Sequence, residues 1–139
     1  MRAILTPEDL KKGDLVEPGW YPLELTDYNE ELVGKSAKNQ GSLNCIFHFK
    51  IFDGPNKGVS PRTQFNETAL GYGKVLWAAF KIPYDKVKGY ELSTELFQGL
   101  KGRKIKGYIK RGKNADTGKE FNELADFQPL EPVAEAPKS

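Results

Sequence analysis

The stretch that decides the fold is "LNCIFHFKIF", residues 43–52. Apolar and mixed side chains alternate along it, as they do in a β-strand, where neighbouring side chains point to opposite faces of a sheet. One face carries Leu43, Cys45, Phe47, Phe49 and Ile51, and the other carries Asn44, Ile46, His48, Lys50 and Phe52. The stretch therefore predicts a strand with one face in a hydrophobic core and a basic, aromatic face outside.

The segments on either side predict the remaining elements. Residues 20–28 alternate as a first strand, with Tyr21, Leu23 and Leu25 on one face and Trp20, Glu24, Thr26 and Tyr28 on the other. The other expected elements are a short N-terminal helix begun by Thr6, a loop at 29–42, strands at 59–66, 103–111 and 120–128, and a helix at 66–83 that Asn66 begins and Pro83 ends. Residues 131–139 contain nothing that forms a core and are expected to be a disordered tail.

The order of these elements is three strands, a helix and two strands, with long loops after the first and fourth strands. It is the order of an OB-fold, a mainly β, five-stranded Greek-key barrel. Residues 1–130 are expected to be a single OB-fold domain with an N-terminal helical extension, and 131–139 its tail. The expected core consists of Leu23, Leu25, Phe47, Phe49, Ile51, Phe65, Trp77, Ile105, Ile109 and Phe127.

Length and composition limit the classes of protein. A chain of 139 residues suits one domain with a real core. Cys45 is the single cysteine, which rules out an internal disulfide and suits a reducing compartment. The longest apolar run, residues 75–80, is far too short to span a membrane, and the N-terminus lacks a signal-peptide pattern. We therefore expect a cytoplasmic protein without membrane contact.

The net charge of +2 conceals a basic middle. Residues 34–113 carry 16 basic and 5 acidic side chains, and residues 101–113 carry seven Lys or Arg and no acid. Threaded as a strand, this last stretch places Lys104, Lys106, Tyr108 and Lys110 on one face and Ile105, Gly107 and Ile109 on the other. A solvated basic face is the ordinary interpretation of such a row. A track for an anionic polymer is the alternative.

Catalysis finds little support in the sequence. His48 is the only histidine and lies mid-strand, and Cys45 falls on the core face of the same strand. No Cys/His cluster indicates zinc, and no glycine-rich phosphate-binding motif opens a helix. We therefore expect a protein that is not an enzyme and has no metal and no cofactor.

Basic and aromatic residues together are typical of single-strand binding, in which cations follow the phosphates and aromatic rings stack on bases. The central segment uses thirteen lysines and three arginines, a balance that favours contact with the backbone over base reading. The candidate stacking residues are Trp20, Tyr28, Phe52 and Tyr108. The candidate polar contacts are Lys35, Lys38, His48, Lys50, Arg62, Lys104, Lys106, Lys110, Arg111 and Lys113. Alternatively, outward aromatics cover a barrel edge or pack against the N-terminal helix.

Several short motifs add a family resemblance. They are "PGWYPLELTDYNE", "FHFKIFDGPNKGVSPRTQFN", a following helix, "LKGRKIKGYIKRG" and a final "GKEFNEL" that contains Asn122. Together they resemble a family of phage-encoded OB-fold single-stranded DNA-binding proteins over roughly residues 17–129. The resemblance implies non-specific coating of single-stranded DNA in phage replication or recombination, in the cytoplasm of a bacterial host.

The resemblance also implies replication or recombination proteins as partners, although Glu131 and Glu135 beside Lys138 make only a weakly acidic C-terminus. The alternative function is an OB-type protein-interaction module of a phage, whose basic strand is only solvated. Binding to oligo-dT that weakens steeply with salt separates the two.

Overall fold

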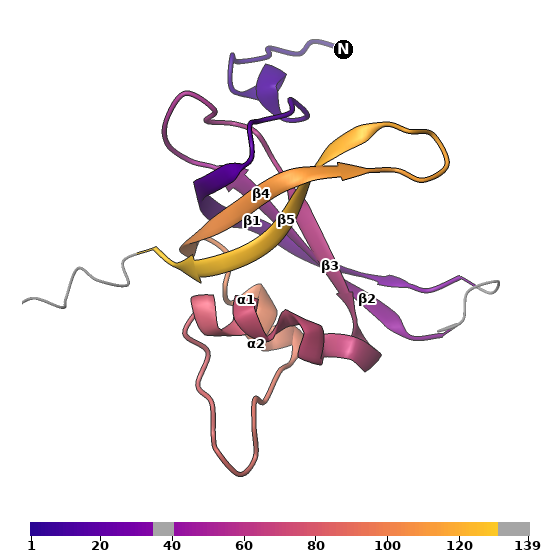
Figure 1. The fold of residues 1–139 in the computed structure, drawn as a ribbon, viewed down its shortest axis with the longest axis vertical. Helices are drawn as coiled ribbons and strands as arrows, with labels where there is room; N and C mark the ends of the chain where they lie inside the picture. The colour runs from indigo at the N-terminus through magenta and orange to yellow at the C-terminus, as the bar shows by residue number, and fades with distance from the viewer. Residues whose placement is uncertain (35–40, 131–139) are drawn as a thin grey trace, which may run out of the picture.

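The computed structural model describes residues 1–34 and 41–130, which form a mainly β fold with a few short helices (Figure 1). In chain order the elements are the 3₁₀ helix η1 (Asp9–Lys11), strands β1 (Gly19–Leu32), β2 (Leu43–Ile51) and β3 (Arg62–Asn66), the 3₁₀ helix η2 (Glu67–Gly73), helices α1 (Lys74–Ala79) and α2 (Thr94–Gln98), and strands β4 (Lys104–Lys113) and β5 (Glu120–Pro129). None of the helices in these two ranges is long and apolar enough to cross a membrane.

The five strands form one antiparallel sheet in the order β3-β2-β1-β4-β5. The long strand β1 joins its two halves. Its first part pairs with β4, from Gly19 opposite Ile109 to Glu24 opposite Lys104, and its later part pairs with β2 as far as Leu32. Strands β3 and β5 are the outer strands, and within the described residues no hydrogen-bonded ladder joins them, so the sheet is open.

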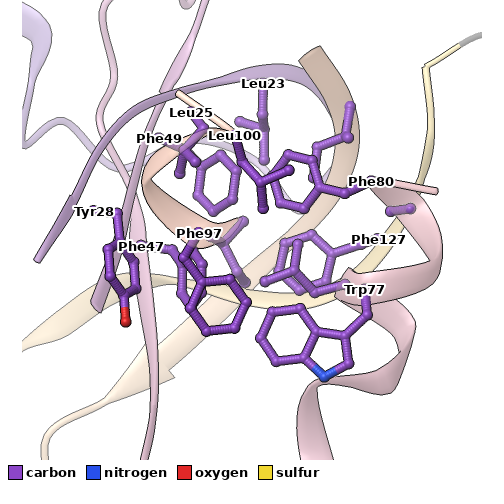
Figure 2. Close-up of a cluster of buried hydrophobic side chains, with 14 of the residues drawn as sticks. Leu23, Leu25, Tyr28, Phe47, Phe49, Trp77, Phe80, Phe97, Leu100 and Phe127 are labelled. Carbon is purple, nitrogen blue, oxygen red and sulfur yellow. The ribbon is translucent and has the colours of Figure 1, made fainter. Parts of the chain in front are cut away.

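The hydrophobic core lies between the inner face of the sheet and the two α-helices (Figure 2). The expected core is confirmed: nine of its ten residues are buried, and the tenth, Phe65, is partly buried and packs against them. Trp77 of α1 and Phe97 of α2 stack at 5.1 Å between ring centroids and close the core beneath Phe47.

Position 107 leaves no room for a side chain larger than that of glycine. A Cβ atom there would lie 2.4 Å from Cδ1 of Leu23 on β1, closer than two carbon atoms can approach. On the inward face of β4, Gly107 therefore stands between Ile105 and Ile109. The side chain of Leu23 fills the space that a side chain at position 107 would need.

The element bounds differ from expectation mainly in four places. Strand β3 begins at Arg62 instead of at residue 59. Strand β1 continues to Leu32, into the stretch that was expected to be loop. The segment expected to be one helix over 66–83 is the 3₁₀ helix η2 followed by the short α1, although Asn66 caps it as predicted by accepting a hydrogen bond from Thr68 N. The N-terminal helix is only three residues long, but the hydroxyl of Thr6 does accept from Asp9 N at 3.1 Å.

Two sets of predictions fall on residues outside the described ranges. They are the loop lysines Lys35 and Lys38 and the C-terminal tail at 131–139.

Candidate nucleic-acid interface

The outer surface of β1 and β4 brings together an aromatic pair and two lysines from the predicted set. Trp20 lies opposite Tyr108 in the strand register, and Lys106 follows opposite Pro22. The rings of Trp20 and Tyr108 meet edge to face with 5.5 Å between centroids. Trp20 is 41% exposed and Tyr108 is half-buried, so the pair presents aromatic surface to solvent.

Phe52 extends this surface from the end of β2. Its backbone N–H donates to the carbonyl of Pro22 at 3.2 Å, which holds the residue beside β1. The ammonium of Lys104 lies 5.3 Å from the centre of the Phe52 ring, within the range of a cation–π interaction. We call the set Trp20, Phe52, Lys104, Lys106 and Tyr108 the β1–β4 face.

The β1–β4 face is about 13 Å long, because Lys104 and Tyr108 are four residues apart on one strand. It is not uniformly basic. Glu24 lies opposite Lys104 in the register, and Asp126 of β5 lies opposite Tyr108. Two lysines in succession, Lys104 and Lys106, therefore precede the aromatic pair along the face, with carboxylates beside them that keep its net charge moderate.

Tyr28 was predicted to share the outer face with Trp20, and this prediction is wrong. It is 2% exposed, and its ring packs against Phe47 and Phe97 at centroid distances of 5.0 and 5.2 Å. A bulge between Leu25 and Asp27 inserts an extra residue into β1. One added residue reverses the facing of every side chain that follows, so Tyr28 turns inward.

The buried Tyr28 hydroxyl has a defined partner. It donates to Glu30 Oε2 at 2.7 Å, and Thr94 donates to the same oxygen at 2.6 Å. Burial raises the pKa of Tyr28 far above its ordinary value. Tyr28 is therefore a core residue that helps to join β1 to the start of α2, and it offers no ring to a base.

The outer surface of β2 and β3 holds the predicted residues His48, Lys50 and Arg62. His48 lies opposite Arg62 in the register, and its Nε2 is 2.6 Å from Oδ1 of Asn29. Lys50 is already engaged by an ion pair with Glu8 at 3.2 Å. Arg62 is exposed. A phosphate that approaches Lys50 would have to compete with the Glu8 carboxylate.

Ile46 lies on the same outer surface in the register, between Asn29 and Gln64, yet it is fully buried. Its outward position was predicted, and its burial was not. Because it is fully buried, it contributes no exposed apolar area to an interface.

Arg111 supports the N-terminal segment instead of standing free. Its Nε donates to the carbonyl of Val16 at 3.2 Å, and its guanidinium lies 3.4 Å from the Glu120 carboxylate. Asn122 holds the same segment, since it accepts from Val16 N at 3.1 Å and donates to the carbonyl of Asp14 at 2.8 Å. Lys110 and Lys113, by contrast, are exposed on the β4–β5 hairpin.

Two side chains in the segment after α1 were not singled out by sequence. Lys81 lines a hollow of about 250 Å³ together with Arg103 and Lys104, and Tyr84 is exposed on the loop that follows α1. No sequence pattern pairs residue 81 with residue 104, because only the fold brings the end of α1 to the start of β4.

Cys45 is a core residue, and its thiol should be unreactive in the folded protein. It is 5% exposed, and burial raises the pKa of the thiol, so little thiolate forms at mildly alkaline pH. We expect an aromatic disulfide reagent to modify it at least about tenfold more slowly in buffer than in denaturing urea. The absorbance of the released thiolate measures both rates, and equal rates would show that Cys45 is accessible.

No group of three or more His, Cys, Asp or Glu side chains in residues 1–34 and 41–130 could hold a metal ion. Comparison with models of protein families and with curated proteins finds no match to this chain. Its function therefore has to be inferred from its own residues.

Proposed function

We propose that this protein binds single-stranded DNA without sequence preference through the β1–β4 face. The observation that carries the proposal is the aromatic pair Trp20–Tyr108 placed in one surface with Lys104 and Lys106. Exposed rings offer stacking surface to any base, and lysines neutralise phosphates without fixed geometry. Such a surface tolerates all sequences, which is what coating a strand requires.

The arrangement of the strands supports an OB-type domain as the scaffold. The strand order and the sharing of β1 between β2 and β4 agree with an OB-fold, in which β3 and β5 meet to close the barrel. Closure between these two strands and the Greek-key barrel itself belong to the proposal. The proposal also includes the two hairpins, β1–β2 and β4–β5, as parts of the binding surface. Both extend toward the same side in Figure 1.

The protein would act by coating and shielding exposed strands, without turnover. Its proposed setting, phage replication or recombination in a bacterial cytoplasm with partners from those processes, is supported by the resemblance of its motifs alone. Lys110 and Lys113 on the β4–β5 hairpin supply further cations that could follow a bound strand.

The test is binding of fluorescent oligo-dT, measured by anisotropy at a series of salt concentrations. We expect affinity to fall steeply with salt, since each neutralised phosphate contributes about 0.7 to the slope of log affinity against log salt. Replacing Lys104 and Lys106 together by alanine should lower the slope by about 1.4, equally for oligo-dT and for mixed sequences.

Lys57→Ala is the control for loss of a single positive charge, because Lys57 lies in the loop after β2 and belongs to neither the β1–β4 face nor the β4–β5 hairpin. It should leave the slope nearly unchanged. Absence of oligo-dT binding at the lowest salt would contradict the proposal, and duplex DNA bound as tightly as single strands would contradict its specificity for single strands.

A further inference from the structure

A basic hollow adjoins the β1–β4 face. It has a volume of about 250 Å³ and is lined by Ala79, Lys81, Arg103, Lys104, Pro129 and Leu130. Lys104 belongs to both surfaces, so the hollow adjoins the face at this residue. Arg103 is held in place because its guanidinium donates to the carbonyl of Phe80 at 2.8 Å, at the C-terminal end of α1.

Lys81 occupies a backbone conformation that normally favours glycine. Its φ is +60°, and it is the only residue other than glycine with a positive φ in the described part of the chain. It follows Phe80, the C-cap residue of α1, at a position where helices commonly end with a glycine in the left-handed region. Glycine would adopt this conformation without strain, so a role for the Lys81 side chain would explain why lysine stands here.

Another hollow, of about 440 Å³, lies next to the basic one and shares Ala79 and Pro129 with it. Its other lining residues are Lys74, Val75, Ala78, Tyr84, Tyr90 and Phe127. Tyr84 is 63% exposed, and its ring lies 4.9 Å from that of Tyr90, which packs against the core. Tyr84 is therefore supported on one side and open to a stacking partner on the other.

We propose that a single strand bound on the β1–β4 face continues past Lys104 and Lys81 and stacks a base on Tyr84. This inference rests on the proposed function, and it assigns the path that a longer strand takes. The two hollows contain four cationic side chains and no carboxylate in their linings, which complements a phosphate backbone. Cations followed by a supported tyrosine repeat the chemistry of the β1–β4 face.

The experiment compares two lengths of oligo-dT, about 6 and about 16 nucleotides, near the ends of the range that one OB-fold occupies. Tyr84→Ala should weaken binding of the long oligonucleotide by about 5- to 150-fold, the loss typical of one stacked base, and leave the short one unchanged. Tyr84→Phe keeps the ring and should restore binding.

Lys81→Gly removes the side chain in a conformation that glycine prefers, so the melting temperature should not fall. For the long oligonucleotide the salt slope should decrease by about 0.7, and for the short one it should not change. The matched control is Lys57→Ala, in the loop after β2, which lies far from α1 in Figure 1. It should alter neither length.

The outcomes separate this inference from the proposed function. If the wild-type protein binds both lengths and the Tyr84 and Lys81 variants match it on both, the path is overturned while single-strand binding stands. If the variants lose the short and the long oligonucleotide equally, these residues do not form an extension. If the wild-type protein binds neither length, the proposed function and the path are both overturned.

Discussion

Replacing Trp77 by alanine is expected to lower the free energy of unfolding by about 3–5 kcal/mol, the cost typical of truncating a buried aromatic residue to alanine. Trp77 is 1% exposed and packs against the rings of Phe47, Phe65 and Phe97. Its Nε1–H also donates to the carbonyl of Leu70 at 3.0 Å, so truncation leaves that carbonyl without its partner. The loss is a large part of the stability of an ordinary domain.

Urea denaturation followed by circular dichroism measures this loss. Val75→Ala is the matched control, since Val75 lies on the same short helix but is 43% exposed, and its cost should stay within about 0.5 kcal/mol. Trp77→Phe keeps one six-membered ring but loses the N–H, and its cost should fall between the two. Similar losses for Trp77→Ala and Val75→Ala would mean that α1 does not close the core.

The sequence predicted the core well because strand alternation is a local property. Phe47 and Phe49 on β2, and Ile105 and Ile109 on β4, face inward as their spacing indicates. The alternation failed at Tyr28, because the bulge before it depends on how β1 pairs with β2. No pattern within β1 itself marks the extra residue.

The sequence also could not explain every feature of the helical segment after β3. Gly71 and Gly73 indicate a weak helix, and the chain does form a 3₁₀ helix before α1. The particular reason for Gly73 lies elsewhere, since a Cβ there would come 2.5 Å from the Trp77 ring. From sequence alone, a glycine that makes room for a neighbouring side chain looks the same as one that weakens a helix. Only the packing distinguishes the two.

Long-range contacts decide which of the predicted cationic side chains are already engaged within the protein. Lys50 is paired with Glu8, and Arg111 with the carbonyl of Val16, and both partners lie in the N-terminal segment. Lys104 and Lys106, in contrast, stand on the outer face of β4 as alternation predicts. The sequence could therefore predict which side chains face outward, but not which of them were already engaged.

We expect Trp20→Ala and Tyr108→Ala each to weaken oligo-dT binding by about 1–3 kcal/mol, because each removes a ring on which a base stacks. The centroids of the two rings are 5.5 Å apart, so the rings are in contact. We therefore expect the double variant to lose less binding free energy than the sum of the two single losses. Tyr72→Ala is the control, because Tyr72 is 86% exposed and lies outside the β1–β4 face and both neighbouring hollows. It should bind as the wild-type protein does.

Tryptophan fluorescence tests the same contact directly. The chain has two tryptophans, and Trp77 is buried, so Trp77→Phe leaves Trp20 as the single reporter on the surface. Stacking of a base on Trp20 should quench this emission as oligo-dT is added, with a midpoint that agrees with the anisotropy titration. Emission that stays unchanged at saturating oligo-dT would remove Trp20 from the interface. Because Trp20 is 41% exposed, its loss should cost little stability, so weaker binding by Trp20→Ala at an unchanged melting temperature reports the contact with DNA.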